Sequence, residues 1–483
     1  MRVAVWILVA GAVAGPAALV RPAASAAPGA ESPLYGTELP ADGYVSSTSC
    51  AAAACHGRGH AGGMRSEYLA WSPDLRPGKP NDPHARAYQV LFNSVSKRIA
   101  SLMELPKPAH ETSLCLKCHA VEAVQPAEAL SEGVGCCGCH GPAKKWLTVH
   151  YQPAWKALSH REKWEQYGFL PVQNLTTRAV NCAGCHVGDA TREVNHELIA
   201  AGHPRLTFEF AGLHVTPGYR KHWEEPLAPA EFESRAWVIG QATSLRNATK
   251  LLGERAKRAE SDSEADWPEF AGYSCVSCHR AIRKDTPRPV PRAQQTRGKS
   301  GWEMLSVAAV DVAAEFTPRV FVGAAVPRLV ALGELREVMA KGSPNLQLVR
   351  QKSAAAVAEL DDWLTALQAA EDRPRAHALA PEVSQQLLNA LAASALTPDR
   401  GALRDHDPDF LAAHAAGCRA VLRGSPDVRL SGHMRELVEV LPVPHTPNGR
   451  LTDWGSGLTN ARMLRVRDQF RDIFDRTRPG GKR

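Results

Sequence analysis

Residues 136–141 read Cys-Cys-Gly-Cys-His-Gly and contain the pattern Cys-x-x-Cys-His at Cys136, Cys139 and His140. This pattern binds one haem covalently, because the two thiols bond to its two vinyl groups and the adjacent histidine becomes the proximal iron ligand. Three more copies with the same spacing occur, namely Cys115, Cys118 and His119; Cys182, Cys185 and His186; and Cys275, Cys278 and His279. The chain has 12 Cys and 19 His in 483 residues. Chance would supply about 0.01 copies at that composition. The sequence therefore predicts several haems of the c type.

A fifth motif has a wider spacing. Cys50 and Cys55 are separated by Ala51 to Ala54, and His56 follows directly. The alternative is a stray cysteine pair beside a histidine. The wide form is used in multihaem cytochromes, and Gly57 follows it as Gly141 follows the third motif. We therefore expect five haem c groups in all.

The amino terminus has the pattern of a secretory signal over residues 1–26. Arg2 precedes an apolar stretch from Val3 to Val20, and Ala24-Ser25-Ala26 is a small-residue cleavage site. An uncleaved membrane anchor is the alternative, but the Gly and Pro residues in the stretch favour cleavage. No later segment has the length and apolarity of a membrane span. We expect a periplasmic or extracellular protein, which agrees with haem attachment in an oxidising compartment.

Two cysteines stand outside the motifs, Cys137 and Cys418. Cys137 lies inside the third motif, and we expect it to be a small filler near the macrocycle. A free thiol or a disulfide between the two is the alternative.

The net charge of +7 does not indicate nucleic-acid binding. Removal of the signal takes away Arg2 and Arg21, and five haems with their propionates contribute about −5 in the ferric state. The ferric protein is therefore expected to be nearly neutral.

The composition divides the chain into two regions after the signal. Residues 27–299 hold every motif, and their last part, residues 280–299, is rich in Arg, Lys and Pro. That part reads as a solvated linker, or alternatively as a docking site for an acidic redox partner. Residues 300–483 have helical periodicity in 346–367, 382–394, 407–422 and 456–475. The sequence predicts an all-α fold with extensive irregular loops, a pentahaem domain followed by a helical bundle-like domain.

One long helix is also expected inside the haem region, from Glu231 to Ala259. Its apolar stripe consists of Phe232, Trp237, Ala242, Leu245 and Leu252. Strand patterns are few in this region, and loops rich in Pro and Gly connect the motifs.

The supply of further histidines indicates bis-histidine ligation. Only Met64 and Met103 offer thioethers near the motifs, whereas nine other histidines lie there: His60, His84, His110, His150, His160, His196, His203, His214 and His222. Histidine–methionine ligation raises the reduction potential, so this composition favours haems of low potential. The histidine count alone does not say which residues are ligands.

Several stretches resemble the cytochrome c-554 family of multihaem cytochromes. They are Asp82-Pro83-His84-Ala85-Arg86-Ala87, Gly133-Val134-Gly135-Cys136 with His140-Gly141-Pro142, Trp146 to His150, Asn195-His196, Gly202 to Leu206 and Trp267 to Phe270. The resemblance covers about residues 45–285, and the helical tail lies outside it.

This resemblance implies distal ligands. His84 would bind the iron of His140, and His150 that of His56. His196, His203 and His222 would be the candidates for the irons of His119, His186 and His279. His196 and His203 would share a face on a continuous helix, but Gly202 and Pro204 can end it first. This chain has a fifth motif, which the tetrahaem members of the family lack. The family's second haem can be five-coordinate, and here that is the haem of His119.

Electron transfer is the leading functional hypothesis. Five haems in one region of about 240 residues must lie close together, and His119 and Cys136 are only 17 positions apart. The expected partners are cytochromes or membrane quinol or cytochrome complexes. The alternative is an oxidoreductase that acts on a small nitrogen or sulfur compound at a five-coordinate haem with nearby proton donors. A third hypothesis, compatible with the first, makes residues 300–483 a partner-binding module.

Overall fold

A computed structural model describes most of the chain after residue 33. The described residues are 34–36, 39–57, 67–72, 82–215, 219, 223–262, 265, 267–275, 302, 304–341, 343–373, 378–396, 408–424, 426–441 and 460–478. The predicted signal, the linker 280–299, His222, Cys278 and His279 lie outside these residues.

The fold is all-α with extensive loops, as predicted. Within the described ranges the only β pairings are isolated bridges, Val45 with Gln125 and Tyr273 with Trp302. The motif-bearing region consists of short helices: η1 Ser47–Cys50, α1 Glu67–Trp71, η2 His84–Arg86, η3 Gln89–Phe92, α2 Ser94–Leu102, η4 Ala109–Glu111, α3 Ser113–His119, η5 Ala127–Glu132, α4 Cys136–His140, α5 Pro153–Ala157, α6 His160–Tyr167, α7 Leu175–His186, α8 His196–Ala200, α9 Phe210–Leu213 and η6 Phe270–Gly272.

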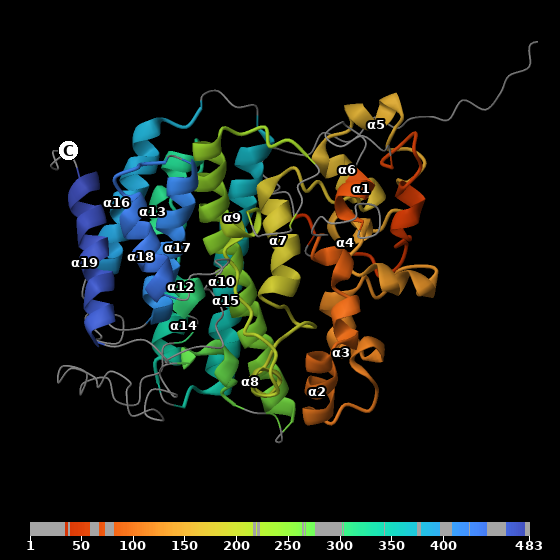
Figure 1. The fold of residues 1–483 in the computed structure, drawn as a ribbon, viewed down its shortest axis with the longest axis horizontal. Helices are drawn as coiled ribbons and strands as arrows, with labels where there is room; N and C mark the ends of the chain where they lie inside the picture. Colours follow the sequence, from red (N-terminus) through yellow and green to blue (C-terminus); the bar gives the residue numbers. More distant parts are fainter. Residues whose placement is uncertain are drawn as a thin grey trace, which may run out of the picture. The chain divides into compact units, whose positions relative to one another are not determined.

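The long helix α10 of the same region and the helices after residue 300, of which only α12 is short among those described, form the rest (Figure 1). They are α10 Pro229–Ser261, α12 Met304–Val307, α13 Val310–Val320, α14 Val330–Met339, α15 Leu346–Asp372, α16 Pro381–Leu396, α17 Pro408–Gly424, α18 Ser431–Val440 and α19 Asn460–Thr477. The four helical stretches expected after residue 300 correspond to α15, α16, α17 and α19. None of the helices in the described part has the length and apolarity needed to cross a membrane.

Helix α10 is the predicted long helix, and it is buried on most of its surface. The five residues of its predicted stripe are all at most 5% exposed. It packs against α7 and α9 of the motif-bearing region and against α13, α15 and α17 (Figure 1). One hydrophobic core runs from Leu34 through α10 to Ile473. The predicted boundary at residue 299 therefore does not separate two hydrophobic cores. That the haem-binding region ends at residue 299 remains a prediction.

Local sequence explains where the short helices stop. Helix α4 ends at Gly141, whose φ is +79° and whose added Cβ would lie 2.6 Å from the carbonyl oxygen of Gly168. Only glycine fits that backbone without strain. Helix α8 ends at Ala201, and Gly202 follows with φ +118°. His196 and His203 therefore do not share one continuous helix.

Helix α15 caps two other helices with its carboxylates. Glu371 accepts hydrogen bonds from the backbone of Leu175 (3.1 Å) and from the backbone and hydroxyl of Thr176 (2.9 and 2.8 Å), at the start of α7. Glu359 accepts from the backbone of Ala331 (2.9 Å) and Leu332 (3.2 Å), at the start of α14. Both contacts satisfy N–H groups that have no partner within their own helix.

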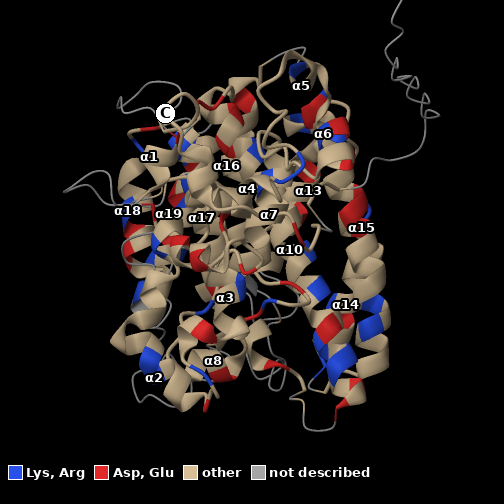
Figure 2. Ribbon diagram, turned by 90° about the vertical axis from the view of Figure 1, so that its right-hand side faces the viewer, with Lys and Arg blue, Asp and Glu red and all other residues tan. Residues whose placement is uncertain are grey.

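Helices α14 and α15 carry charged residues of both signs (Figure 2), and in α15 the basic Arg350 and Lys352 precede the acidic residues. Lys352 of α15 lies 2.6 Å from Glu334 of α14. Such exposed pairs contribute at most about 1 kcal/mol. The packing of these helices therefore depends on the apolar core, which includes Leu335, Leu360 and Leu364.

Glu371 should give the protein a stability that falls as the pH rises. Burial raises the pKa of Glu371 from 4.5 to about 7, so the folded state binds the proton more tightly than the unfolded state. The stabilisation is complete below about pH 4.5 and is lost as the pH rises through about 7, by roughly 1 to 3 kcal/mol. Urea denaturation between pH 4.5 and 7.5 measures this slope.

The variant Glu371→Gln should lack that part of the slope. Glu359→Gln is the matched control, because Glu359 caps α14 in the same manner, and it should keep the slope. Equal slopes in the wild-type protein and Glu371→Gln would contradict the assignment.

Candidate functional site

Three attachment motifs occupy the carboxyl-terminal ends of α3, α4 and α7. In a helix, residues three and four positions apart lie on one face, so both cysteines and the histidine of a motif can face the same group. The first motif follows η1, which ends at Cys50. Cys275 lies two residues after Tyr273, whose backbone bridges to Trp302.

The motifs lie side by side in a fixed order. The backbone N–H of Cys136 donates to the hydroxyl of Ser47 in η1 at 3.1 Å, and the sulfur of Cys185 lies 3.9 Å from the carbonyl oxygen of Lys117 in the second motif. The third and fourth motifs meet where Asn181 donates to the carbonyl oxygen of Gly138 at 3.0 Å. The first motif thus adjoins the third, the third adjoins the fourth, and the fourth adjoins the second.

Burial and hydrogen bonding set the thiol pKa values of these cysteines. Burial raises the pKa of Cys182 to about 11 and that of Cys139 beyond its ordinary range. The interaction with Cys118 and the nearby guanidinium of Arg192 together lower the pKa of Cys185 to about 6. Arg192 donates to the Cys185 sulfur at 3.4 Å. Before haem attachment, Cys185 is therefore more readily a thiolate than Cys182 or Cys139.

Six motif-region histidines meet in pairs. The ring centroids of His56 and His150 are 6.1 Å apart, with an angle of 14° between the ring planes. His84 and His186 are 6.2 Å apart at 77°, and His119 and His203 are 6.4 Å apart at 89°. Across the described part of the chain, no group of three or more His, Cys, Asp or Glu side chains is placed to hold a metal ion.

These separations fit an iron between two imidazoles. Each metal–nitrogen bond is about 2 Å long, so two rings on opposite sides of one metal ion have centroids about 6 Å apart. In each pair one residue is a proximal histidine that follows two motif cysteines: His56, His119 or His186. The pairs therefore have the donor set, the spacing and the neighbouring thiols that haem c requires.

Hydrogen bonds at Nδ1 orient five of the six rings. Nδ1 of His119 donates to Ala87 O (2.8 Å), that of His203 to Pro204 O (2.8 Å), and that of His150 to Leu147 O (2.9 Å). Nδ1 of His56 lies 3.1 Å from Glu67, and that of His84 lies 3.0 Å from Asp82. Because these oxygens accept, the hydrogen is on Nδ1 and Nε2 keeps its lone pair for a metal.

The partner of His84 differs from the expected one. The resemblance implied the iron of His140, but the ring of His84 lies against His186. The third and fourth motifs are packed against each other, so His186 lies within reach of the same loop. Asp82 accepts from both the backbone N–H and Nδ1 of His84, which fixes the direction of the ring.

The remaining described histidines have other surroundings. Buried His214 lies between Phe210 O (2.8 Å) and the guanidinium of Arg178 (3.2 Å). His160 lies 2.9 Å from Asp372, and His110 stacks on Phe92 at 4.1 Å. The ring of His140 stacks on Phe169 at 5.9 Å, and that of His196 meets the edge of Phe270 at 6.0 Å.

The two cysteines outside the motifs are both buried and free of disulfides. Cys137 packs with Ala143, Trp146 and Trp155, whereas Cys418 belongs to the large core around α10. Burial raises the pKa of both thiols, to about 12 for Cys418. Their separate clusters favour the expected filler role for Cys137 over a disulfide between the two.

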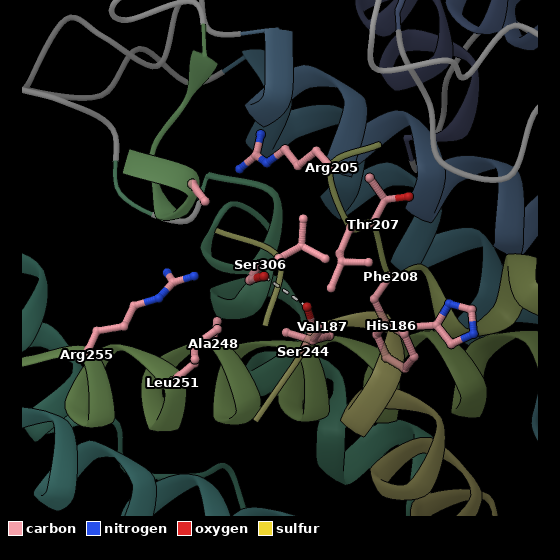
Figure 3. Close-up of a pocket in the computed structure, with 13 residues that line it drawn as sticks. His186, Val187, Arg205, Thr207, Phe208, Ser244, Ala248, Leu251, Arg255 and Ser306 are labelled. Carbon is pink, nitrogen blue, oxygen red and sulfur yellow. Dashed lines mark hydrogen bonds between the residues drawn. The ribbon is translucent and has the colours of Figure 1, made fainter. Parts of the chain in front are cut away.

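A small, partly open pocket lies behind the fourth motif, between α10 and residues 205–208 (Figure 3). Arg205 and Arg255 line it from opposite sides, and Ser244 and Ser306 are hydrogen-bonded at 2.9 Å. Arg205 lies 3.0 Å from Asp409, and Arg255 lies 2.9 Å from Glu193. Carboxylates therefore balance both of the arginines among the described residues that line the pocket.

The sequence reading missed the groups that orient the rings. Asp82 stands two residues before His84 in the segment Asp82-Pro83-His84. An Asp at that spacing commonly forms a local hydrogen bond, so the sequence could have indicated this contact. The carbonyl of Ala87 is 32 residues from His119. Such a contact depends on tertiary structure alone and leaves no pattern in the sequence.

Comparison with known proteins gives a match over part of the chain. Residues 77–141 match the family model described as cytochrome c554 and c-prime. That segment contains His84 and the second and third motifs. No curated protein and no solved structure matches the chain. Residues 77–141 are thus similar to a family of c-type cytochromes, which are proteins that transfer electrons through bound haem.

Proposed function

We propose that this chain is an exported cytochrome that holds five haem c groups, mostly with two histidine ligands, and carries electrons between redox proteins. The observation that carries this proposal is the set of three histidine pairs. Each pair joins a proximal histidine to a distant histidine at the separation that one iron requires.

The pairs supply three ligand assignments. His150 serves the iron of His56, His203 that of His119, and His84 that of His186. Of the remaining candidates, His196 is assigned to the iron of His279, because its ring adjoins Phe270 close to Cys275.

Bound haem supplies a group that takes up and releases one electron. The chain's part is to hold both axial rings in place, so that reduction needs little rearrangement. Electron tunnelling weakens steeply with distance, so a conduit needs its haems close together. The direct contacts between first and third, third and fourth, and fourth and second motifs meet this need.

The compartment follows from the sequence pattern and the chemistry. Residues 1–26 have the features of a cleaved signal, and covalent haem attachment takes place in an oxidising compartment. The expected partners are other cytochromes or membrane quinol or cytochrome complexes in the periplasm or outside the cell.

The number of haems is directly testable. Protein made with the haem-attachment machinery should contain five haems per chain by pyridine haemochrome assay and intact mass. A variant with Cys275→Ala and Cys278→Ala should contain four, because one attachment motif is lost. Cys418→Ala is the control and should keep five. Four haems in the wild-type protein, or no loss in the double variant, would overturn the count of five attachment sites.

The angles between ring planes predict two classes of electron paramagnetic resonance signal. Nearly parallel rings, as in His56 and His150 at 14°, should give an ordinary rhombic low-spin signal. Nearly perpendicular rings leave two iron d orbitals close in energy and give a larger maximum g value. This is expected for the pairs at 77° and 89°. A fully oxidised sample at low temperature with only one class present would contradict these pairings.

Removal of one distal ring should open one iron. The variant His203→Ala should convert the low-spin signal of the His119 haem to high spin and allow nitric oxide to bind there, while the wild-type protein binds none. His110→Ala is the control, because His110 stacks on Phe92 instead of on a motif histidine. Nitric oxide binding by the wild-type protein would instead favour an oxidoreductase with an open iron.

A further inference from the structure

The hydrogen-bond partners of the ligand histidines fall into two chemical classes. The rings of His119, His203 and His150 donate to neutral backbone carbonyls. The rings of His84 and His56 donate to the carboxylates of Asp82 and Glu67. The histidine pairs therefore differ in the charge of the group that accepts the Nδ1 hydrogen of the ligand ring.

A carboxylate behind Nδ1 changes what Nε2 offers to a metal. It draws the Nδ1 hydrogen toward itself, so the ring becomes a more basic and stronger donor. A stronger donor, with a negative charge close by, stabilises ferric iron over ferrous iron. The effect lowers the reduction potential of that haem, whereas a neutral carbonyl does so only weakly.

Burial decides which carboxylate has the larger effect on the reduction potential of its haem. The Asp82 side chain is 4% exposed, and that of Glu67 is 30% exposed. Water screens the exposed charge, whereas the buried one acts through a medium of low dielectric constant. Tyr219 also packs edge-on against the His84 ring at 5.8 Å.

The geometry at Asp82 is fixed as well as buried. One carboxylate oxygen accepts from the backbone N–H of His84 at 2.9 Å and from its Nδ1 at 3.0 Å. Pro83 lies between the two residues and restricts the backbone of this short turn. The carboxylate therefore cannot turn away from the ring without breaking both contacts.

We propose that Asp82 is a positioning residue that lowers the reduction potential of the haem held by His84 and His186. Glu67 has the same effect, but smaller, on the haem held by His56 and His150. The inference rests on the proposed function. It divides the described histidine pairs into those in which a carboxylate accepts the Nδ1 hydrogen of a ligand ring and those in which only backbone carbonyls do so.

The test is a potentiometric titration of the purified holoprotein, followed by visible and electron paramagnetic resonance spectra. Asp82→Asn keeps an oxygen acceptor of the same shape and removes the charge. At the wild-type midpoint of one haem, its ratio of ferrous to ferric iron should rise about tenfold, or about 59 mV for one electron. The g values of that haem should shift too, and the electron paramagnetic resonance signals of the other haems should remain unchanged.

Two further variants keep the proposal falsifiable. Glu67→Gln, at a more exposed position, should raise a different midpoint by less. Asp189→Asn removes a carboxylate three residues after His186 that pairs with Arg192 instead of a histidine, and it should leave the g values of every haem unchanged. Unchanged midpoints in Asp82→Asn and Glu67→Gln, or equal effects of Asp82→Asn and Asp189→Asn, would overturn the proposal. A protein that binds no haem would refute the proposed function itself.

Discussion

A histidine that binds a metal must keep one ring nitrogen bare and hold the ring still. The hydrogen bond at Nδ1 meets both requirements, and the rest of the motif-bearing region is arranged to supply it. The acceptors come from the turn that carries the histidine, as at Pro204, or from a loop far away in sequence, as at Ala87. A ring fixed in this way has already lost its rotational freedom, so binding does not have to offset that entropy.

The helices after residue 300 contribute to this arrangement although they hold no motif. Glu371 of α15 caps α7, whose other end carries the fourth motif. Asp409 of α17 pairs with Arg205, and the guanidinium of Arg205 lies 4.0 Å from the sulfur of Cys275. Removal of either partner of a buried ion pair leaves a charge without compensation, so these contacts favour one relative position of the two segments.

Residue patterns predicted the local features of this protein well. Cysteine and histidine spacing identified the motifs, and apolar periodicity located α10, α15, α16, α17 and α19 within a few residues. Both signals depend on neighbours within a few positions. The distal partner of His84 and the carbonyl behind His119 depend instead on how separate motifs pack, so sequence alone gave a different partner for the first and none for the second.

The composition change near residue 300 also suggested more independence than the packing allows. Helix α10 precedes that position but buries Trp237, Ile239 and Leu245 completely in a core shared with α13, α15 and α17. A chain cut at residue 299 would expose these side chains to water and lose a large hydrophobic contribution to folding. A graft of the motif-bearing region onto another protein would therefore have to bring the helices that cover α10.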